Sequence, residues 1–222
     1  MATIESVKEV YETIASHFSD TRYSHWKCVR DFLDLFESDQ LIGDIGCGNG
    51  KNMLYRKDLH YIGCDITENL VEIARQKTGN EIIVANGTSM PFISRFFDAS
   101  MSVAVIHHLM TFKLRKKFLE EMVRCTQVGG LIMFTVWMRD QPLKKKWTPI
   151  PCGEGGEGGD YWIPWHNRSD NKDSNNKEST VLKRYYHLFT ESEVLDLIPS
   201  NCTLEKITSE CYNYCVILRK LA

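Results

Sequence analysis

Two short segments of the chain carry side chains and backbone suited to binding a ligand. Residues 102–108, SVAVIHH, form an apolar run that ends on the adjacent histidines His107 and His108. Imidazoles in such a position can ligate a metal, transfer a proton or orient a substrate. Residues 43–52, GDIGCGNGKN, combine four glycines with the acid Asp44. Glycines let a backbone turn tightly and present free N–H groups to the negative part of a ligand.

The cysteines and histidines are not spaced as metal ligands. The chain has eight cysteines but no CxxC pair, whereas a zinc site uses Cys or His pairs at short spacing. Cys211 and Cys215 form a CxxxC, yet on an extended strand these positions are roughly 13 Å apart. Several cysteines lie in apolar runs, which is typical of reduced, buried thiols. We therefore predict no metal site.

The glycine segment matches neither of two common phosphate-binding patterns. Ile45 stands where a P-loop needs glycine, and Asn52 where it needs Ser or Thr. Lys51 stands where a dinucleotide-binding GxGxxG motif needs its third glycine. The remaining pattern is acid-x-Gly-x-Gly-x-Gly, starting at Asp44, with Asp65 following 21 residues later at the end of the next apolar run.

This pattern resembles the S-adenosylmethionine site of the Rossmann-like methyltransferases, in which the glycine loop passes the methionine moiety and the second acid binds both ribose hydroxyls. Asn86 stands where that superfamily often has an acid facing adenine, and we expect its oxygen to accept from the adenine amino group. The cofactor residues that the resemblance implies are Tyr11, Asp44, Gly46, Cys47, Gly48, Asp65, Ile66, Asn86, Gly87 and Val103. A glycine-rich turn of purely structural use is the alternative.

The elements around these residues alternate between strand and helix patterns. Apolar runs at 41–46, 60–66, 81–87, 98–106 and 129–137 are separated by helical segments near 67–77 and 111–126. Alternation of this kind predicts a parallel sheet with right-handed crossovers. Helical patterns at 3–18 and 24–38 precede it, a helix opened by Thr190 and a closing hairpin follow it, and residues 139–180 interrupt it. We predict one α/β domain over residues 1–222, a Rossmann-like class I methyltransferase with a mostly parallel seven-stranded sheet and an antiparallel C-terminal hairpin. The 139–180 insertion is expected to be partly mobile.

Composition and charge restrict the class of protein. A net charge of −2 argues against non-specific coating of nucleic acid, although a local basic patch would suffice for an RNA substrate. The chain has no run of 18 apolar residues, and its N-terminal segment is too polar for a signal peptide. We expect no membrane insertion and a cytoplasmic location, with the nucleus as a second compartment.

The end of the fourth strand indicates the methyl acceptor. VIHH lacks the Asn/Asp-Pro-Pro-aromatic signature of many exocyclic-amine methylases, and no cysteine stands where RNA C5 methylases keep their nucleophile. These absences favour oxygen as the acceptor.

Several longer segments resemble the eukaryotic tRNA wobble-uridine carboxymethyl O-methyltransferases, including the methyltransferase domain of the animal tRNA hydroxylase fusion. The resemblance runs from Val7 to Arg219. It rests on residues 10–26, 44–52, 62–75, 102–108 with 136–141, and 184–194, with IPWH at 163–166 and CVILRK at 215–220 in support. The chain departs from the family at Asn86 and at 212–214, where relatives tend to have an Asn-Trp pair.

The resemblance implies esterification of the carboxylate of 5-carboxymethyluridine, or of its 2-thio form, at the tRNA wobble position. Such a carboxylate is already ionised at pH 7 and needs no strong base, but burying it without a partner is unfavourable. We expect His107 to line the pocket and His108 to point the other way on an extended strand end. Residues 1–38 are expected to form lid helices. The candidate catalytic residues are Arg22, His107, His108, Arg184 and His187.

Two surfaces are candidates for macromolecular partners. Lys144, Lys145, Lys146 and Trp147 put three charges beside an aromatic ring, as a phosphate contact next to a stacking platform would, although a solvated basic loop is an equal alternative. Members of the family work with a small zinc-binding activator subunit. Ile82, Ile83 and Val84 lie in the expected edge strand, and we predict that the activator adds a strand there to give a heterodimer.

Two other functions remain open from the sequence. A methyltransferase for a small acid or quinone-like metabolite would have the same cofactor site but no RNA to contact. A catalytically inactive scaffold would keep the fold alone, and the intact Asp44, Gly46, Gly48 and Asp65 set speaks against it.

Overall fold

The computed structural model describes residues 3–151, 159–165 and 181–222. Two parts of the predicted 139–180 insertion, and His166 of the IPWH motif, lie outside these residues. No helix in the described ranges is long and apolar enough to cross a membrane.

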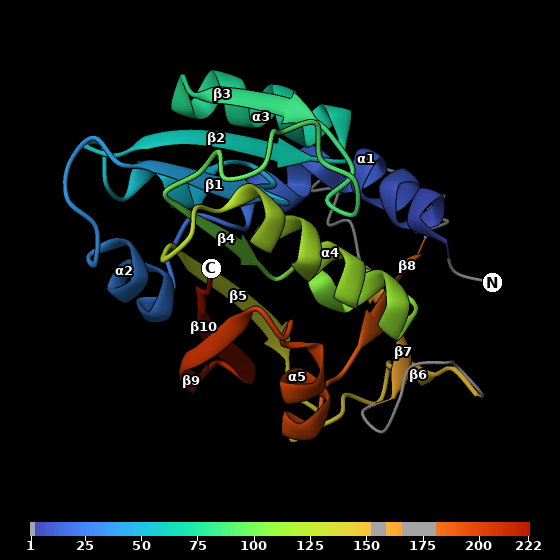
Figure 1. The fold of residues 1–222 in the computed structure, drawn as a ribbon. Coiled ribbons are helices and arrows are strands. Elements are labelled where there is room, and N and C mark those ends of the chain that lie inside the picture. Colours follow the sequence, from blue (N-terminus) through green and yellow to red (C-terminus); the bar gives the residue numbers. More distant parts are fainter. Residues whose placement is uncertain (1–2, 152–158, 166–180) are drawn as a thin grey trace.

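The main sheet has seven strands in the order β3-β2-β1-β4-β5-β10-β9 (Figure 1). Strands β1 to β5 pair in parallel, and β10 is antiparallel to both β5 and β9. This arrangement confirms the predicted class I methyltransferase fold with an antiparallel C-terminal hairpin. The strands are β1 (Leu41–Ile45), β2 (His60–Asp65), β3 (Glu81–Val84), β4 (Ala99–Val103), β5 (Leu131–Trp137), β9 (Cys202–Glu210) and β10 (Asn213–Lys220).

Helices pack on both faces of this sheet, and each face has its own hydrophobic core. On one face α4 (Phe112–Cys125) and α5 (Glu191–Leu197) bury Phe118, Leu119 and Val194. On the other, α2 (Lys27–Leu33) and α3 (Glu68–Thr78) bury Phe32 and Val71. Two layers of helices around one sheet are what an alternating strand and helix pattern requires.

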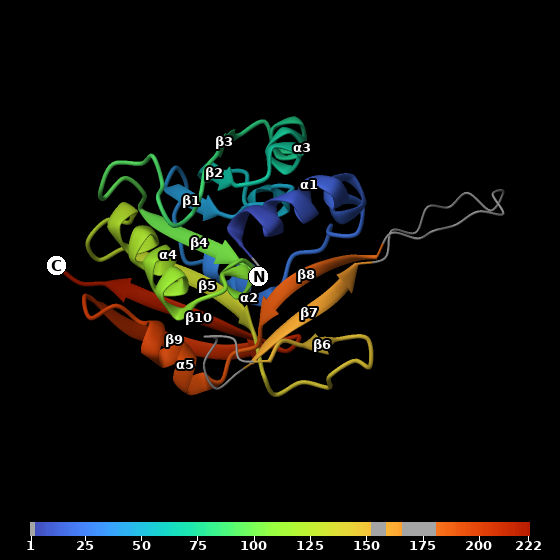
Figure 2. The same cartoon turned by 90° about the vertical axis from the view of Figure 1, so that its right-hand side faces the viewer.

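Helix α1 (Ile4–Asp20) lies across the end of the sheet at which the parallel strands terminate (Figure 2). Thr3 and Ser6 form a capping box at its start, and the predicted box of Thr190 and Glu193 begins α5 in the same way. A capping box satisfies backbone N–H groups that a helix start would leave unpaired.

Helix α2 is shorter than the 24–38 segment that the apolar spacing predicts. The first residues of the predicted segment precede the helix and contact the glycine loop. The Ser24 carbonyl accepts from Lys51 Nζ at 2.8 Å, and His25 Nε2 lies 2.8 Å from the Lys51 carbonyl. At its C-terminal side the chain turns at Asp39, which has φ 67°. Tertiary contacts thus override local helix preference at both ends.

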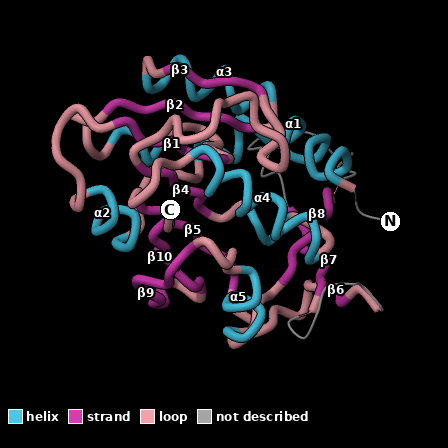
Figure 3. Tube along the Cα trace, in the orientation of Figure 1, coloured by secondary structure: helices cyan, strands magenta, loops and turns pink. Residues whose placement is uncertain are grey.

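A second, three-stranded antiparallel sheet covers the same end of the molecule as α1. It consists of β6 (Thr148–Pro149), β7 (Asp160–Trp165) and β8 (Leu182–His187), in that order. The first two of these strands come from the predicted insertion. In Figure 2 strand β8 runs next to α1, and Figures 2 and 3 show the three strands on the side of the main sheet at which β4 and β5 end.

Candidate active site

A single cavity at the carboxyl ends of the parallel strands brings most of the predicted residues together. Its wall combines the glycine loop after β1, the ends of β2, β3 and β4, helix α1 and strand β8. Every predicted cofactor residue except Asp44 lies on this wall, as do Arg22, His107, His108 and Arg184. In open α/β sheets this end of the strands is where ligands bind.

Close packing explains why the glycine loop needs glycine. A Cβ atom on Gly46 would lie 2.3 Å from Val105 Cγ2, and the residue has φ 74°, a conformation that disfavours other residues. The N–H groups of Gly46 and Cys47 both donate to the Cys64 carbonyl, at 2.7 and 3.0 Å. The loop is therefore attached to β2 and held against the turn that carries the histidines.

Two buried acids lie at the base of the loop. Asp65 accepts from the Gly48 N–H through Oδ2 and from the Thr67 N–H through Oδ1, both at 2.9 Å. Asp44 is fully buried, and neither of its carboxylate oxygens has a hydrogen-bond partner among the described residues. Burial, and then the charge of Asp65, raise the pKa of Asp44 to about 7. An uncompensated buried carboxylate is unfavourable, so this region suits a ligand that carries positive charge.

The part of the cavity next to β3 is lined mostly by apolar residues. A Cβ atom on Gly87 would lie 2.1 Å from Phe118 Cε2, so glycine lets α4 approach the wall. Leu109, Phe118 and Ile66 line this part, as a flat aromatic base would require. Asn86 also lies on the wall, but its Oδ1 accepts from the N–H and hydroxyl of Thr88, both at 2.9 Å. The Asn86 oxygen is therefore engaged in an Asx turn and is not a free acceptor, and its contact with adenine stays a prediction.

The two histidines lie in a 3-10 turn, Ile106–His108, and not on an extended strand end. Strand β4 stops at Val103, and Ala104 follows with φ 63°. This turn puts both imidazoles on the cavity wall. The prediction that His108 points the other way is therefore wrong, because side chains alternate only where the backbone is extended.

His108 is fully engaged, whereas His107 is not. His108 Nδ1 lies 2.9 Å from the Tyr185 carbonyl, and its Nε2 lies 2.9 Å from the Tyr11 hydroxyl. A carbonyl only accepts, so Nδ1 carries the proton and Nε2 accepts from Tyr11. His107 stacks on Tyr186 at 4.8 Å, and neither of its nitrogens has a partner among the described residues.

Both imidazoles are neutral at pH 7. Burial lowers the pKa of His107 well below its ordinary value, and the neighbouring His108 and Arg184 add to the effect. Burial lowers the pKa of His108 to about 3. The histidines can thus donate or accept hydrogen bonds but supply no positive charge.

Strand β8 divides its side chains between the cavity and the interior. Arg184 and Tyr186 face the cavity, as residues two apart on a strand should. Arg184 Nη1 donates to the Tyr186 hydroxyl at 2.9 Å, and its guanidinium lies 4.6 Å from the ring centroid of Trp165. Tyr186 and Trp137 are wall residues absent from the predicted site, and strict alternation from Arg184 would have identified Tyr186.

His187 lies behind the cavity wall, in contrast to its predicted catalytic role. It is fully buried, and its Nδ1 lies 2.7 Å from Asp160 Oδ1. The Tyr185 hydroxyl donates to the same oxygen at 2.6 Å. Burial alone would raise the pKa of Asp160, but hydrogen bonds from His187 and Tyr185 outweigh it and hold this pKa below its ordinary value. His187 therefore supports β8 from the side opposite to the cavity.

The remaining wall comes from the N-terminal segment. Tyr11, Phe18, Arg22 and Trp26 line the cavity, as the lid prediction proposed. The Arg22 guanidinium lies 5.3 Å from the Phe18 ring and 5.8 Å from the Trp165 ring. This cation thus lies near Arg184, with the Trp165 ring in contact with both.

The two predicted partner surfaces lie outside the cavity. Lys144, Lys145 and Lys146 are exposed, whereas Trp147 packs on Trp137 at 5.6 Å and is only partly exposed. Trp147 is therefore not a free stacking platform. Strand β3 lies at the sheet edge as predicted. Ile82 is buried, Ile83 is intermediate and Val84 is 46% exposed.

Known proteins resemble the chain over most of its length. Residues 43–134 match the family described as "Methyltransferase domain". The tRNA (carboxymethyluridine(34)-5-O)-methyltransferase alkbh8 of Xenopus tropicalis is 35% identical over 258 residues, which cover 98% of this chain and 41% of that protein. The chain thus spans less than half the length of this relative.

A shorter relative and a solved structure match over most of their own length. The tRNA (carboxymethyluridine(34)-5-O)-methyltransferase of Schizosaccharomyces pombe is 33% identical over 204 residues, covering 87% of this chain and 86% of that protein. The structure "Complex between the Haloferax volcanii Trm112 methyltransferase activator and the putative methyltransferase" matches with a TM-score of 0.67 and 12% identity, over 97% of this chain and 98% of that chain. The latter shows the shared fold. Because the fission-yeast protein matches over most of both chains, this chain belongs to the tRNA (carboxymethyluridine(34)-5-O)-methyltransferase family.

Proposed function

We propose that the chain transfers a methyl group from S-adenosylmethionine to the carboxylate of 5-carboxymethyluridine, or its 2-thio form, at the wobble position of tRNA. The names of two relatives that the chain resembles support this reaction. The choice of an anionic acceptor rests on the buried cation Arg184. This residue is 8% exposed and lies on the cavity wall, and its Nε has no partner among the described residues.

The charges around the cavity suit an ionised acceptor. A carboxylate is a nucleophile at pH 7 without deprotonation, so the neutral histidines need not act as bases. Arg184 is the buried cation that offsets the desolvation of the anion. Arg22 is more exposed and lies near the same ring, that of Trp165. A planar guanidinium also fits a carboxylate with two hydrogen bonds.

The two histidines have separate positioning roles in this proposal. His107 offers free nitrogens to the reacting groups, whereas His108 holds Tyr11 and β8 in place. Methyl transfer is an in-line displacement, in which alignment of the reactants can contribute on the order of 7 to 11 kcal/mol. Replacement of His107 should therefore reduce kcat more than it reduces cofactor affinity.

The cofactor residues fit S-adenosylmethionine, which supplies an electrophilic methyl group on a sulfonium when bound. Asp65 would hold the ribose hydroxyls, and the apolar wall of Leu109 and Phe118 would hold adenine. The buried carboxylate of Asp44 lies beneath the loop, where it favours the positive charge of the methionine end. The resemblance implies these roles, and the hydrogen-bond donors, burial and charge around the cavity support them.

A direct assay tests the proposed reaction. The chain, alone and with its activator, is incubated with S-adenosylmethionine and tRNA that carries either 5-carboxymethyluridine or unmodified uridine at the wobble position, and nucleosides are analysed by mass spectrometry. We expect methyl ester only on the modified tRNA. Methylation of a free small acid but not of tRNA would favour the small-molecule alternative, and absence of cofactor binding in calorimetry would favour the scaffold.

We further propose that Lys144, Lys145 and Lys146 contact tRNA phosphates. They are exposed and precede β6. The next residue, Trp147, packs on Trp137 of the cavity wall and so places the lysine segment near the cavity. Each phosphate contact contributes salt-dependent affinity without sequence preference. The segment would therefore hold the anticodon arm near the cavity without selecting the base.

The proposed activator surface is the outer edge of β3. The Ala85 N–H donates to the Asp65 carbonyl, so by alternation Ile82 and Val84 direct their backbone groups away from β2. Arg75 Nε donates to the Ile82 carbonyl at 2.8 Å and covers part of this edge. Strand addition by an activator would use the remaining groups and displace Arg75.

A further inference from the structure

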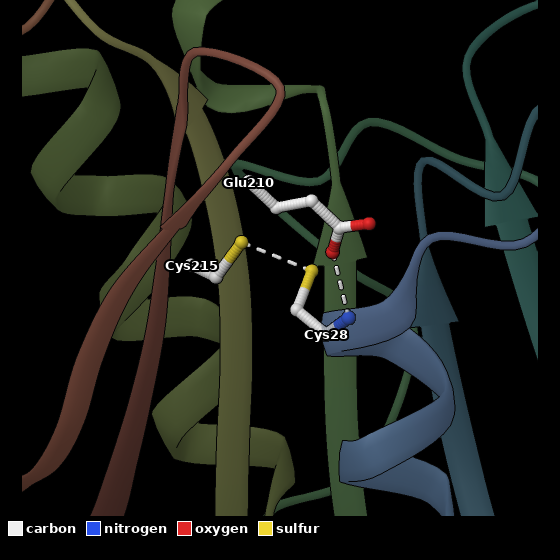
Figure 4. A group of neighbouring side chains, drawn as sticks. All are labelled: Cys28, Glu210 and Cys215. Carbon is white, nitrogen blue, oxygen red and sulfur yellow. Dashed lines mark hydrogen bonds between the residues drawn. The ribbon is translucent and has the colours of Figure 1, made fainter.

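Three potential metal-binding side chains lie together outside the cavity, where α2 meets the C-terminal hairpin. Cys28 is in the first turn of α2, Glu210 ends β9, and Cys215 is in β10. Their ligand atoms all lie within 4.8 Å of one another, and Figure 4 shows the side chains converging from these elements. The sequence prediction of no metal site considered short spacings only, whereas this group joins residues 187 positions apart.

Each donor is held in place by its surroundings. The two carboxylate oxygens of Glu210 accept from the N–H groups of Lys27 and Cys28, both at 2.8 Å. Each oxygen keeps a further lone pair for another contact. Cys28 and Cys215 bring their sulfur atoms to 2.9 Å. The hairpin turn is fixed as well, because Asn213 Nδ2 donates to the Cys211 carbonyl at 2.9 Å.

The group offers two thiols and one carboxylate, and the nearest cations are paired elsewhere or form no ion pair with it among the described residues. Within the described part of the chain Glu210 forms no ion pair, and the Lys27 ammonium is paired with Asp31 at 2.6 Å. Two thiolates and a carboxylate are a donor set that zinc and similar ions bind. Cys28 and Glu210 are partly exposed, so an ion and a water ligand can reach them.

The sulfur positions are compatible with an ion. Tetrahedral zinc with Zn–S bonds of about 2.3 Å holds two sulfurs about 3.8 Å apart. Binding would therefore widen the contact between Cys28 and Cys215, which a small rotation of the two side chains allows, and would not compress it.

We propose that Cys28, Glu210 and Cys215 form a site for a thiophilic divalent cation of the zinc class, with water as fourth ligand. Binding replaces both thiol protons by the metal, so each ion bound releases two protons to solvent. The ion links α2 to the last strand. Because Trp26 of the cavity wall is the residue before α2, the site stabilises the base of the lid and takes no part in methyl transfer.

The test uses the reduced 222-residue chain without any activator, titrated with Zn²⁺ against a chromophoric chelator and with Cd²⁺ in the ultraviolet. We expect one ion per chain, a cadmium–thiolate charge-transfer band, and a rise in Tm of about 5 to 10 °C at a free metal concentration 100 times Kd. Cys28→Ser and Cys215→Ser should lose the band and the Tm shift. Cys211→Ser, which changes an exposed cysteine on the same hairpin, should keep both.

Three outcomes would overturn the proposal. The first is wild-type chain that binds no stoichiometric metal, a result that does not depend on the folding of any variant. The second is a band that persists in both serine variants. The third is a reduced chain that binds no metal but forms a Cys28–Cys215 disulfide with glutathione disulfide, because that result assigns a redox pair instead.

Discussion

The Tyr11 hydroxyl donates a hydrogen bond of 2.9 Å to His108 Nε2 and so joins the N-terminal helix to the turn after β4. The direction of this bond follows from the other side of the ring, where Nδ1 donates to the Tyr185 carbonyl. Helix α1, the histidine turn and strand β8 are thereby connected through one neutral imidazole. The lid is thus part of the active-site wall and not a separate cover.

Tyr11→Phe should loosen this wall. The change leaves the buried Nε2 of His108 without its donor, which costs about 1 to 3 kcal/mol of desolvation free energy in the folded active site. If this cost falls on the reactive geometry, kcat/KM for tRNA should fall by about 5- to 150-fold. Steady-state kinetics with both substrates measure it. Tyr23→Phe is the control, because Tyr23 is 75% exposed and should leave the rate unchanged. Equal kcat/KM values for the two variants would show that the contact has no functional role.

Asp44→Asn should stabilise the ligand-free chain while it weakens cofactor binding. The pKa of Asp44 rises from 3.8 to about 7 on folding, so its ionisation destabilises the folded state progressively between about pH 4 and pH 7. Above pH 7 the free energy of unfolding of the asparagine variant should be up to about 4 kcal/mol larger than that of wild type, as the difference between the unfolded and folded pKa of Asp44 implies. Below pH 4 the two proteins should not differ.

Urea unfolding at pH 4 and pH 8, together with calorimetric titration of S-adenosylmethionine, separates the two effects. Asp140→Asn is the matched control, since Asp140 is exposed. A variant that is no more stable than wild type at pH 8 would contradict the assignment of an uncompensated carboxylate to Asp44.

Arg184→Gln should remove the anion site without affecting the cofactor. Loss of one partner of a buried charge pair is worth 2 kcal/mol or more, so kcat/KM for tRNA should fall at least about 30-fold. The Kd of S-adenosylmethionine should stay within about threefold. Arg184→Lys keeps the charge but not the planar stack on Trp165 and should be intermediate. Wild-type kcat/KM in the glutamine variant would exclude Arg184 as the carboxylate partner.

The parallel sheet and the cofactor loop were predictable because local patterns determine them, whereas the strand order was implied by the resemblance to the methyltransferases. Apolar runs that alternate with helical segments leave few topologies, and the spacing from Asp44 to Asp65 reflects one loop and one crossover. Gly46 is explained by contacts within that unit and with Val105. The glycine pattern can be recognised from the sequence alone, whereas its packing against Val105 is visible only in the structure.

The acceptor side was less predictable because it depends on backbone detail and long-range packing. The sequence SVAVIHH does not indicate that Ala104 adopts φ 63°. This backbone conformation directs both histidines to the cavity. Asn86 was assigned to adenine, yet a local turn with Thr88 occupies its oxygen. Residue type favours His187 as a catalytic candidate, whereas alternation along β8 decides that Tyr186 reaches the cavity.

Asp160→Asn should destabilise the fold, because the carboxylate contacts three buried side chains, Arg115, His187 and Tyr185. Asp160 Oδ1 lies 3.7 Å from Arg115 Nη2 and 2.7 Å from His187 Nδ1. Loss of a buried partner is worth about 3 to 5 kcal/mol, so Tm should fall by about 6 to 20 °C. Because the pKa of Asp160 is lowered, the wild-type contribution is present above about pH 4 and is lost on further acidification.

Thermal unfolding at pH 7 and pH 3 measures this difference, which should shrink at the lower pH. Assays at 20 °C, where the variant is still folded, should give a kcat close to wild type if His187 only supports β8. A large loss of kcat with an unchanged Tm would instead indicate that His187, supported by Asp160, acts in catalysis.

Val84→Pro should weaken association with a strand-adding activator while it leaves the isolated fold intact. The N–H of Val84 points away from β2 by the alternation along β3, so proline removes a donor that the sheet does not use. Arg75→Ala should act in the opposite direction, because it frees the Ile82 carbonyl that Arg75 covers. Binding of the purified activator, measured by calorimetry, should therefore weaken at least about tenfold in the first variant and strengthen in the second. Hydrogen exchange provides an independent readout, since the backbone of residues 82–84 should become protected only in the complex. Unchanged affinity in Val84→Pro, with no protection of this strand, would place the activator on another surface.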